Sequence, residues 1–127
     1  MTELELITQR YRRRQAALQR MVADMRWLIA QRPGSLRWTG TQRDLVEMVH
    51  LVWLQHSIID NRGCPYTRRR LAAMAFAAVG RAVPGSLSRI VSFVSARVSP
   101  ELSMVSRYEQ LALEDHIINH FTTTTTL

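Results

Sequence analysis

Residues 36–47, with the sequence LRWTGTQRDLVE, decide the fold because they join a polar turn directly to an apolar helix. Thr39 stands three positions before Gln42, and Thr41 stands three positions before Asp44, so two overlapping capping-box patterns mark the same boundary. Asp44 also places negative charge in the first turn, where the helix dipole favours it. This stretch therefore predicts a helix that begins close to residue 41.

The apolar residues that follow recur at helical spacing as far as residue 57. They are Leu45, Val49, Val52 and Trp53, with Met48 and His56 close to the same face. His50 and His56 lie on or beside that face, and we interpret them as packing residues because no carboxylate and histidine set has ligand spacing with them. The best-defined helix of the chain is therefore predicted at residues 41–57.

Residues 3–31 contain no proline or glycine and predict a long helix that ends at Pro33. The apolar residues follow a heptad, with Leu4, Tyr11, Leu18 and Met25 at one seam position and Ile7, Met21 and Leu28 at the other. Only Arg14 interrupts the seam, and Val22 and Ile29 widen the apolar stripe. Two alternatives stay open: the helix packs on its own domain, or it forms a homodimer through the same face.

Length and composition predict one domain, because 127 residues that are 46% hydrophobic can bury one core. No apolar run reaches the roughly 18 residues of a membrane span, and the N-terminus lacks the pattern of a secretory signal, so we expect a cytoplasmic protein with no membrane partner. The single cysteine, Cys64, fits a reducing compartment. We divide the chain into an N-terminal amphipathic helix at 1–33, a helical domain at 36–121 and a flexible threonine-rich tail at 122–127.

Three more helices are predicted beyond the central one. A turn-rich connection at 58–67, with room for a very short strand but no sheet, precedes a helix that starts at Thr67. A fourth helix, capped by Ser86, has a predicted buried stripe of Leu87, Ile90, Val91, Val94 and Val98. Ser99, Pro100 and Glu101 predict the start of a fifth helix that extends as far as Asn119. The predicted fold class is all-α, with about five helices.

Charge is unevenly distributed along the chain. All 17 basic residues are arginines, and residues 1–100 carry 16 of them against 6 acidic residues, a net charge of +10. Residues 101–127 carry Arg107 against four acidic residues, a net charge of −3. A basic body with an acidic end indicates a polyanionic partner, of which nucleic acid is the commonest.

The first turn of the third helix contains Arg68, Arg69 and Arg70. Cations at this position oppose the helix dipole, by about 0.3–1 kcal/mol each. A helix N-terminus with free amides and guanidinium groups is, however, a good phosphate site. The competing interpretation is a genome-wide preference for arginine, placed here in a residue with good helix propensity.

The fourth helix carries a row of serines opposite its predicted buried stripe. The row consists of Ser88, Ser92, Ser95 and Ser99, flanked by Arg89, Phe93 and Arg97. Serine is a mediocre helix former, so such a row needs a reason. Hydroxyls and arginines bind phosphates and base edges, which favours a DNA-reading role for Ser88, Arg89, Ser92 and Arg97. The alternative is a small-residue face against which another helix packs.

Enzymatic chemistry has no support in the residue pattern. His116 and His120 stand four positions apart on a predicted helix, but two histidines are too few for a closed metal site. No nucleophile and base, carboxylate pair or glycine-rich phosphate loop has workable spacing. We therefore expect a protein that is not an enzyme and uses no cofactor.

The stretch from residue 36 resembles the RteC family, regulators associated with tetracycline-induced excision of conjugative elements in Bacteroides-like bacteria. The likeness is carried by Trp38, Thr39, Gly40, Thr41, Asp44, Leu45, Val46 and Glu47, which match the family's Trp-Thr-Gly-Ser/Thr-x-x-Asp-Leu-x-Glu signature. A looser match follows at 57–63 and in the helix after Gly85, so that the resemblance covers roughly residues 36–113.

This resemblance implies a DNA-binding transcriptional regulator whose helices 41–57, 67–79 and 86–97 form a helix-turn-helix or winged-helix-like unit, with 86–97 as the reading helix. We accordingly expect double-stranded DNA as the partner, with Arg68, Arg69 and Arg70 gripping the backbone. Binding to half-sites would require a dimer, for which the heptad seam is the predicted interface. The alternative is a small helical module that binds another protein and no nucleic acid.

Overall fold

The computed structural model describes residues 1–95 and 103–125. Within these residues, five α-helices and one pair of short strands are present, so the expectation of a mainly helical protein is confirmed. In chain order the elements are α1 (Glu3–Ile29), β1 (Leu36–Trp38), α2 (Gln42–Gln55), α3 (Arg68–Ala78), α4 (Leu87–Ser95), α5 (Met104–Gln110), the 3-10 helix η2 (Ile117–His120) and β2 (Thr122–Thr124).

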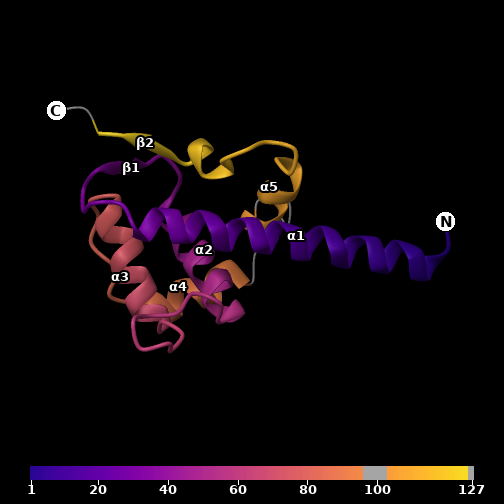
Figure 1. Cartoon of the computed structure of the whole chain (residues 1–127), viewed down its shortest axis with the longest axis horizontal. Coiled ribbons are helices and arrows are strands. Elements are labelled where there is room, and N and C mark those ends of the chain that lie inside the picture. Colours follow the sequence, from indigo (N-terminus) through magenta and orange to yellow (C-terminus); the bar gives the residue numbers. More distant parts are fainter. Residues whose placement is uncertain (96–102, 126–127) are drawn as a thin grey trace.

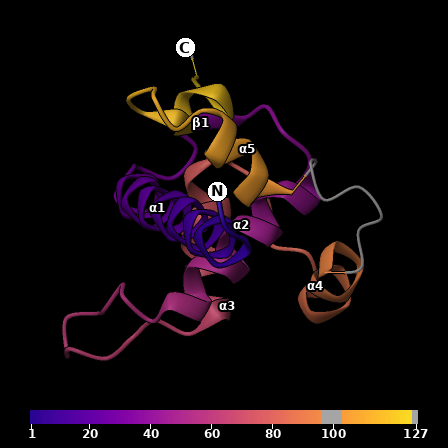
Figure 2. The ribbon, with the colours of Figure 1, turned by 90° about the vertical axis from the view of Figure 1, so that its right-hand side faces the viewer.

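Helix α2 forms the centre of the domain, and α1, α3, α4 and α5 pack around it (Figures 1 and 2). Its position explains why consecutive residues are buried on every side of the helix: Leu45, Val46, Met48, Val49 and Val52 are all shielded from solvent. The helix begins as predicted, because the hydroxyl of Thr41 accepts a hydrogen bond from the amide of Asp44 and the Asp44 carboxylate accepts one from the amide of Thr41.

The other predicted capping box, formed by Thr39 and Gln42, is wrong. Thr39 lies outside the helix, and its hydroxyl donates to the backbone oxygen of His120 at 3.3 Å. The side chain of Trp38 supports the Thr41–Asp44 capping box, because its Nε1 donates to the carbonyl of Thr41 at 2.9 Å. The start of α2 is therefore set by the Thr41–Asp44 capping box together with the hydrogen bond from Trp38.

The predicted flexible tail at 122–127 is wrong for the described residues up to 125. Thr122–Thr124 forms β2, which pairs antiparallel with β1 in the register Leu36 to Thr124 and Trp38 to Thr122. β-Branched threonines suit a strand, and the ring of Phe121 stacks on Trp38 with centroids 5.6 Å apart. The threonine run therefore joins the C-terminal segment to β1, which directly precedes α2.

The predicted fifth helix does not run to Asn119. Its expected start at Ser99 lies outside the described residues, and α5 is capped by Ser103, whose hydroxyl accepts from the amide of Ser106 at 3.2 Å. After Gln110 the chain turns, and His116 adopts a left-handed conformation with φ of 55°. A right-handed helix cannot continue through such a residue, so the C-terminal segment forms the separate η2.

Helix α1 divides into two halves with different surroundings. From Ala17 onward the heptad residues are buried against the domain, with Met21, Met25 and Leu28 fully shielded. Before residue 15 every residue is exposed, and this half extends from the domain as a rod (Figure 1). Among the described residues, no helix combines the length and the apolar character that crossing a membrane requires.

Candidate nucleic-acid interface

The RteC-like motif residues are structural in this chain. Trp38 is almost completely buried and bonds the carbonyl of Thr41, as described above. Gly40 leaves room for this indole, because a Cβ at that position would lie 3.0 Å from Trp38 Nε1 and 3.2 Å from Asp44 Oδ2. Leu45 is fully buried beneath the turn. The motif therefore builds a tight junction between β1 and α2.

Two acidic residues of the same motif attach α5 to α2. Asp44 accepts hydrogen bonds from Arg107, and Glu47 Oε1 accepts from the amide of Met104 at 2.9 Å. Burial by itself would raise the pKa of Asp44, but the hydrogen bonds from Arg107 and Thr41 together outweigh burial and hold the pKa below its usual value. Both carboxylates are thus used in holding the fold together.

The N-terminus of α3 presents the predicted arginine run. Thr67 caps the helix, with its hydroxyl accepting from the amide of Arg70 at 3.1 Å. Arg69 and Arg70 are exposed, whereas Arg68 is half-buried against its neighbours. Arg69 and Arg70 are therefore accessible to a ligand, whereas Arg68 contacts other parts of the protein.

Arg68 connects three helices. Its Nη2 donates to Ser88 Oγ of α4 at 3.0 Å, its Nη1 lies 3.4 Å from His50 Nδ1 of α2, and its guanidinium stacks over Trp53 at 5.3 Å from the ring centroid. Burial, with the nearby charge of Arg68, lowers the pKa of His50, which favours the neutral imidazole that can accept a hydrogen bond from Arg68. This cluster places the start of α3 beside α4.

Helix α4 packs one side on α2 and leaves the other side open. Val91 is buried, Leu87 and Ile90 are half-buried, and the predicted Val98 lies outside the described residues. Its exposed side carries Ser88, Arg89, Ser92 and Phe93. Within the described residues, this side of α4 is therefore left uncovered.

The structure brings together most of the residues that the sequence singled out for DNA binding. Ser88, Arg89 and Ser92 share the open side of α4, and Arg68 joins this side to the start of α3. Arg97 lies outside the described residues. The sequence reasoning missed Arg43, an exposed residue of α2 whose guanidinium lies 5.7 Å from the ring centroid of Phe93. Only the folded chain places Arg43 against α4, so no local pattern pointed to it.

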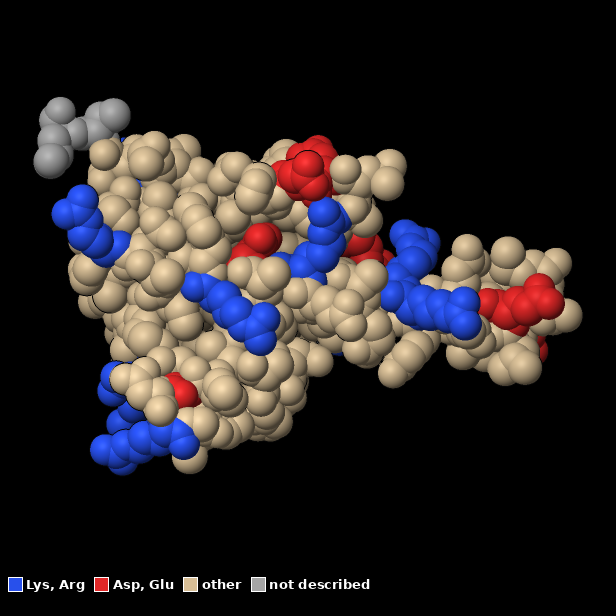
Figure 3. All heavy atoms as spheres, in the orientation of Figure 1, with Lys and Arg blue, Asp and Glu red and all other residues tan. Residues whose placement is uncertain are grey.

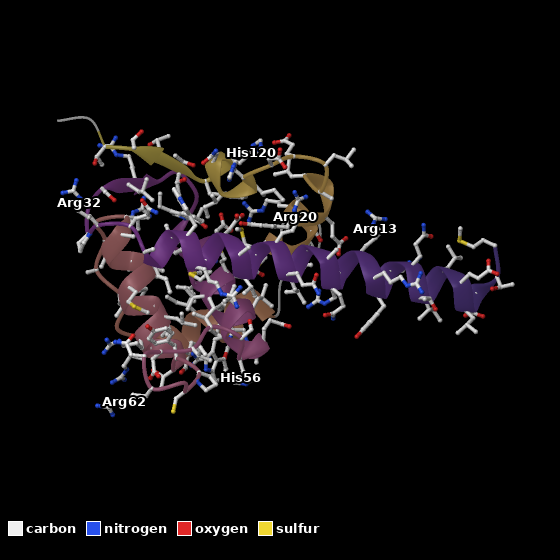
Figure 4. All side chains as sticks on the ribbon, viewed as in Figure 1. Arg13, Arg20, Arg32, His56, Arg62 and His120 are labelled. Atoms are coloured by element: carbon white, nitrogen blue, oxygen red, sulfur yellow. The ribbon has the colours of Figure 1, made fainter. Side chains whose placement is uncertain are left out.

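Several other arginines bind the protein's own backbone. Arg20 donates to the carbonyls of Ala112 and Glu114, Arg26 to that of Ser57, and Arg81 to that of Trp38. Figure 4 shows Arg20 beside the C-terminal segment, while Arg62 points away from the loop before α3. The wide scatter of arginines over the visible face in Figure 3 is thus partly a consequence of these structural contacts.

The remaining polar groups hold the C-terminal segment in place. Asp24 of α1 accepts from the Tyr108 hydroxyl at 2.7 Å and from the amide of Ile118 at 3.1 Å. Burial raises the pKa of Asp24 and that of Tyr108. His120 contacts Glu114, and among the described residues no three His, Cys, Asp or Glu side chains gather as a metal site would require.

Comparisons with known proteins assign no family to this chain. No protein-family model matches it, and no match is found among curated proteins or solved structures. The RteC-like motif therefore stays a resemblance.

Proposed function

We propose that this protein binds double-stranded DNA through the start of α3 and the open side of α4, as a transcriptional regulator linked to a mobile or conjugative element. The observation that supports the proposal best is the hydrogen bond from Arg68 to Ser88, 3.0 Å long. It holds the start of α3 beside α4, although Arg68 and Ser88 lie 20 positions apart in the chain. The link to a mobile element comes only from the RteC resemblance.

The charge of this region suits a polyanion. Residues 61–100 contain seven arginines, at positions 62, 68, 69, 70, 81, 89 and 97, and no aspartate or glutamate. A segment without acidic residues does not itself repel phosphates, and exposed arginines displace the counterions that surround DNA. Asp60, one residue before this segment, lines a pocket together with Arg62 and Arg70. Arg69, Arg70 and Arg89 are exposed and are the residues that we assign to phosphate contacts.

The hydroxyls of α4 add hydrogen-bonding groups to this charge. Ser88 Oγ accepts from Arg68, which leaves its own hydrogen for donation to a phosphate or a base. Ser92 Oγ donates to the carbonyl of Ser88 at 3.1 Å, so it serves as an acceptor toward a ligand. An α-helix is about 10–12 Å across with its side chains, and a major groove about 12 Å wide admits one, so the 9-residue α4 is of a size that can enter it.

In this proposal α2, α3 and α4 act as a helix-turn-helix unit with α4 as the reading helix. Its support is that α3 and α4 both pack on α2 and that α4 has an open side. A wing contributes nothing to it, because the β1–β2 pair lies at the end of the molecule away from α4 (Figures 1 and 2). Recognition would therefore depend on α4 and on the arginines around it.

The proposal is tested by fluorescence anisotropy of a labelled duplex at low salt. The variant Arg69→Gln/Arg89→Gln removes two exposed charges from the proposed surface and should weaken binding at least about tenfold. The matched control Arg32→Gln/Arg37→Gln removes two exposed charges elsewhere and should weaken it much less. Failure of the wild-type chain to bind any duplex at low salt would contradict the proposal.

A second candidate function is that of a helical module that binds protein and no nucleic acid. The observation in its favour is the exposed apolar stripe on the first half of α1, where Ile7 and Tyr11 are 56% and 64% exposed. Large exposed apolar side chains in a row are typical of interaction surfaces. This candidate predicts association with a protein under conditions in which the chain binds no duplex.

A further inference from the structure

The first half of α1, residues 3–14, is a helix with an unpartnered apolar stripe. The stripe consists of Leu4, Ile7 and Tyr11, which are 73%, 56% and 64% exposed and occupy the heptad seam. The helix is well formed from its first turn, because Thr2 and Glu5 make a reciprocal capping box. The same seam is buried by the domain farther along α1, so the stripe continues an established packing face.

Charge on this projecting half is segregated along its length. Glu3 and Glu5 lie at the free end, and Arg10, Arg12, Arg13 and Arg14 follow them. Figure 3 shows acidic side chains at the tip of the rod and basic side chains between the tip and the domain. The segment therefore has a negative end and a positive end.

We propose that two copies of this chain associate by pairing their projecting halves in antiparallel orientation. In this arrangement Ile7 of each copy faces Tyr11 of the other, and Leu4 of each faces Arg14 of the other. Each acidic end then lies beside the basic end of the partner copy, so that Glu3 of one copy comes close to Arg14 of the other. The pairing goes beyond DNA binding and does not depend on it.

Arg14, the one interruption of the heptad, decides the orientation. Parallel pairing would place the two copies of Arg14 opposite each other in the seam and align like charges from Arg10 to Arg14. Antiparallel pairing lets the methylene stem of Arg14 cover Leu4 while its guanidinium reaches the acidic end of the other helix. The residue that weakens a parallel coiled coil is thus favourable in the antiparallel one.

The size of the contact predicts a weak, reversible dimer. A segment of this length extends about 18 Å, which is too short to bury the roughly 1,200 Å² of a standard stable interface. We therefore expect monomer and dimer to exchange at micromolar to millimolar concentrations. The two domains would lie at opposite ends of the paired helices.

The first test is sedimentation velocity of the full chain across that concentration range. Ile7→Asp places a charge in the seam and should raise the dimer Kd at least about tenfold, without changing the fold because the side chain is exposed. Leu113→Asp, at a fully exposed residue outside α1, is the matched control and should leave the Kd unchanged. A wild-type chain that stays monomeric throughout, or a dimer that Ile7→Asp does not affect, would overturn the proposal.

The second test determines the orientation. Glu3→Arg/Glu5→Arg makes the whole segment basic and should weaken the dimer. Adding Arg10→Glu/Arg12→Glu/Arg13→Glu/Arg14→Glu should restore it because both ends are then reversed together. In a Cys64→Ser background, a mixture of Ile7→Cys and Tyr11→Cys chains should form the mixed disulfide in preference to either homodimer. Preferred homodisulfides, or no restoration by the combined charge reversal, would contradict antiparallel pairing.

These outcomes can be separated from those of the DNA-binding tests. Arg69→Gln/Arg89→Gln lies away from the projecting half and should leave the dimer Kd unchanged even if duplex binding is lost. Loss of the dimer through Ile7→Asp should likewise leave the binding of one domain to a short duplex in place. Each proposal therefore stands or fails by its own measurement.

Discussion

Asp44 at the start of α2 accepts hydrogen bonds of 2.5 and 3.2 Å from Arg107 of α5, across 63 positions of sequence. The same carboxylate accepts from the amide of Thr41, so one buried side chain caps a helix and ties a distant helix to it. Through Asp44, the RteC-like motif therefore joins the start of α2 to α5.

Asp44→Asn should therefore destabilise the chain. The substitution keeps the shape of the side chain but removes the charge that Arg107 and the amide of Thr41 bind, and we expect a loss of about 1–3 kcal/mol in the free energy of unfolding. Urea denaturation followed by circular dichroism measures the change. Asp115→Asn, at an exposed position, is the control and should stay close to wild type. Equal midpoints for wild type and Asp44→Asn would show that the ion pair contributes nothing.

The acid stability profile should also depend on Asp44. Its pKa in the folded chain lies below the usual 3.8, so the folded state holds this proton more weakly than the unfolded state does. The contribution of the carboxylate is therefore present above pH 3.8 and is lost as pH falls through the lower folded value. The stability difference between wild type and Asp44→Asn should shrink on acidification, which denaturation curves over a pH series would measure.

The contribution of Asp24 to stability should change with pH in the opposite direction to that of Asp44. Burial raises its pKa above 3.8 in spite of the hydrogen bonds from Tyr108 and Ile118, so the folded state holds the proton more tightly. The stabilising contribution of protonation is present below pH 3.8 and is lost as pH rises through the folded value. Relative to Asp24→Asn, wild type should lose stability across that rise, and a difference that grows in favour of wild type would refute the assignment.

Gly40 should tolerate no side chain. A Cβ there would lie 3.0 Å from Trp38 Nε1 and 3.2 Å from Asp44 Oδ2, so Gly40→Ala must displace the buried indole or the capping carboxylate. We expect a loss of about 1–3 kcal/mol, measured by thermal or urea denaturation. Gly85→Ala is the matched control because no atom lies within 4 Å of its added methyl group. Similar losses for both variants would contradict the close approach at Gly40.

Local sequence signals predicted α1 to α4, but they extended the fifth helix too far and did not predict the pairing of β1 with β2. The start of α2 could be predicted because Thr41 and Asp44 are near neighbours in the sequence. Which of Thr41 and Thr39 caps the helix could not be predicted, because it depends on the hydrogen bond from Trp38. The threonine run contains no apolar residue that would indicate burial, so its pairing with β1 could not be predicted from the sequence. In β1, Leu36 and Trp38 are buried and Arg37 is exposed, but an alternation over three residues is too short to predict a strand.

The candidate site, like the fold, could be predicted from the sequence only in part. The sequence identified the arginine run and the serines of α4, since both are unusual in composition. It could not show that Arg68 would bind Ser88, or that Arg43 would lie over Phe93, because these contacts join separate helices. The heptad of α1 was equally clear in both halves, although only the second half has a domain to pack on.

The most direct test of DNA binding is the dependence of duplex affinity on salt. We predict that log K for the wild-type chain falls linearly with log salt, with a slope of about −0.9 for each phosphate contacted. Arg69→Gln/Arg89→Gln should make that slope shallower by about 1 to 2, while Arg32→Gln/Arg37→Gln should leave it nearly unchanged. An affinity that does not respond to salt, or equal slopes for the two variants, would contradict a DNA-binding surface on α3 and α4.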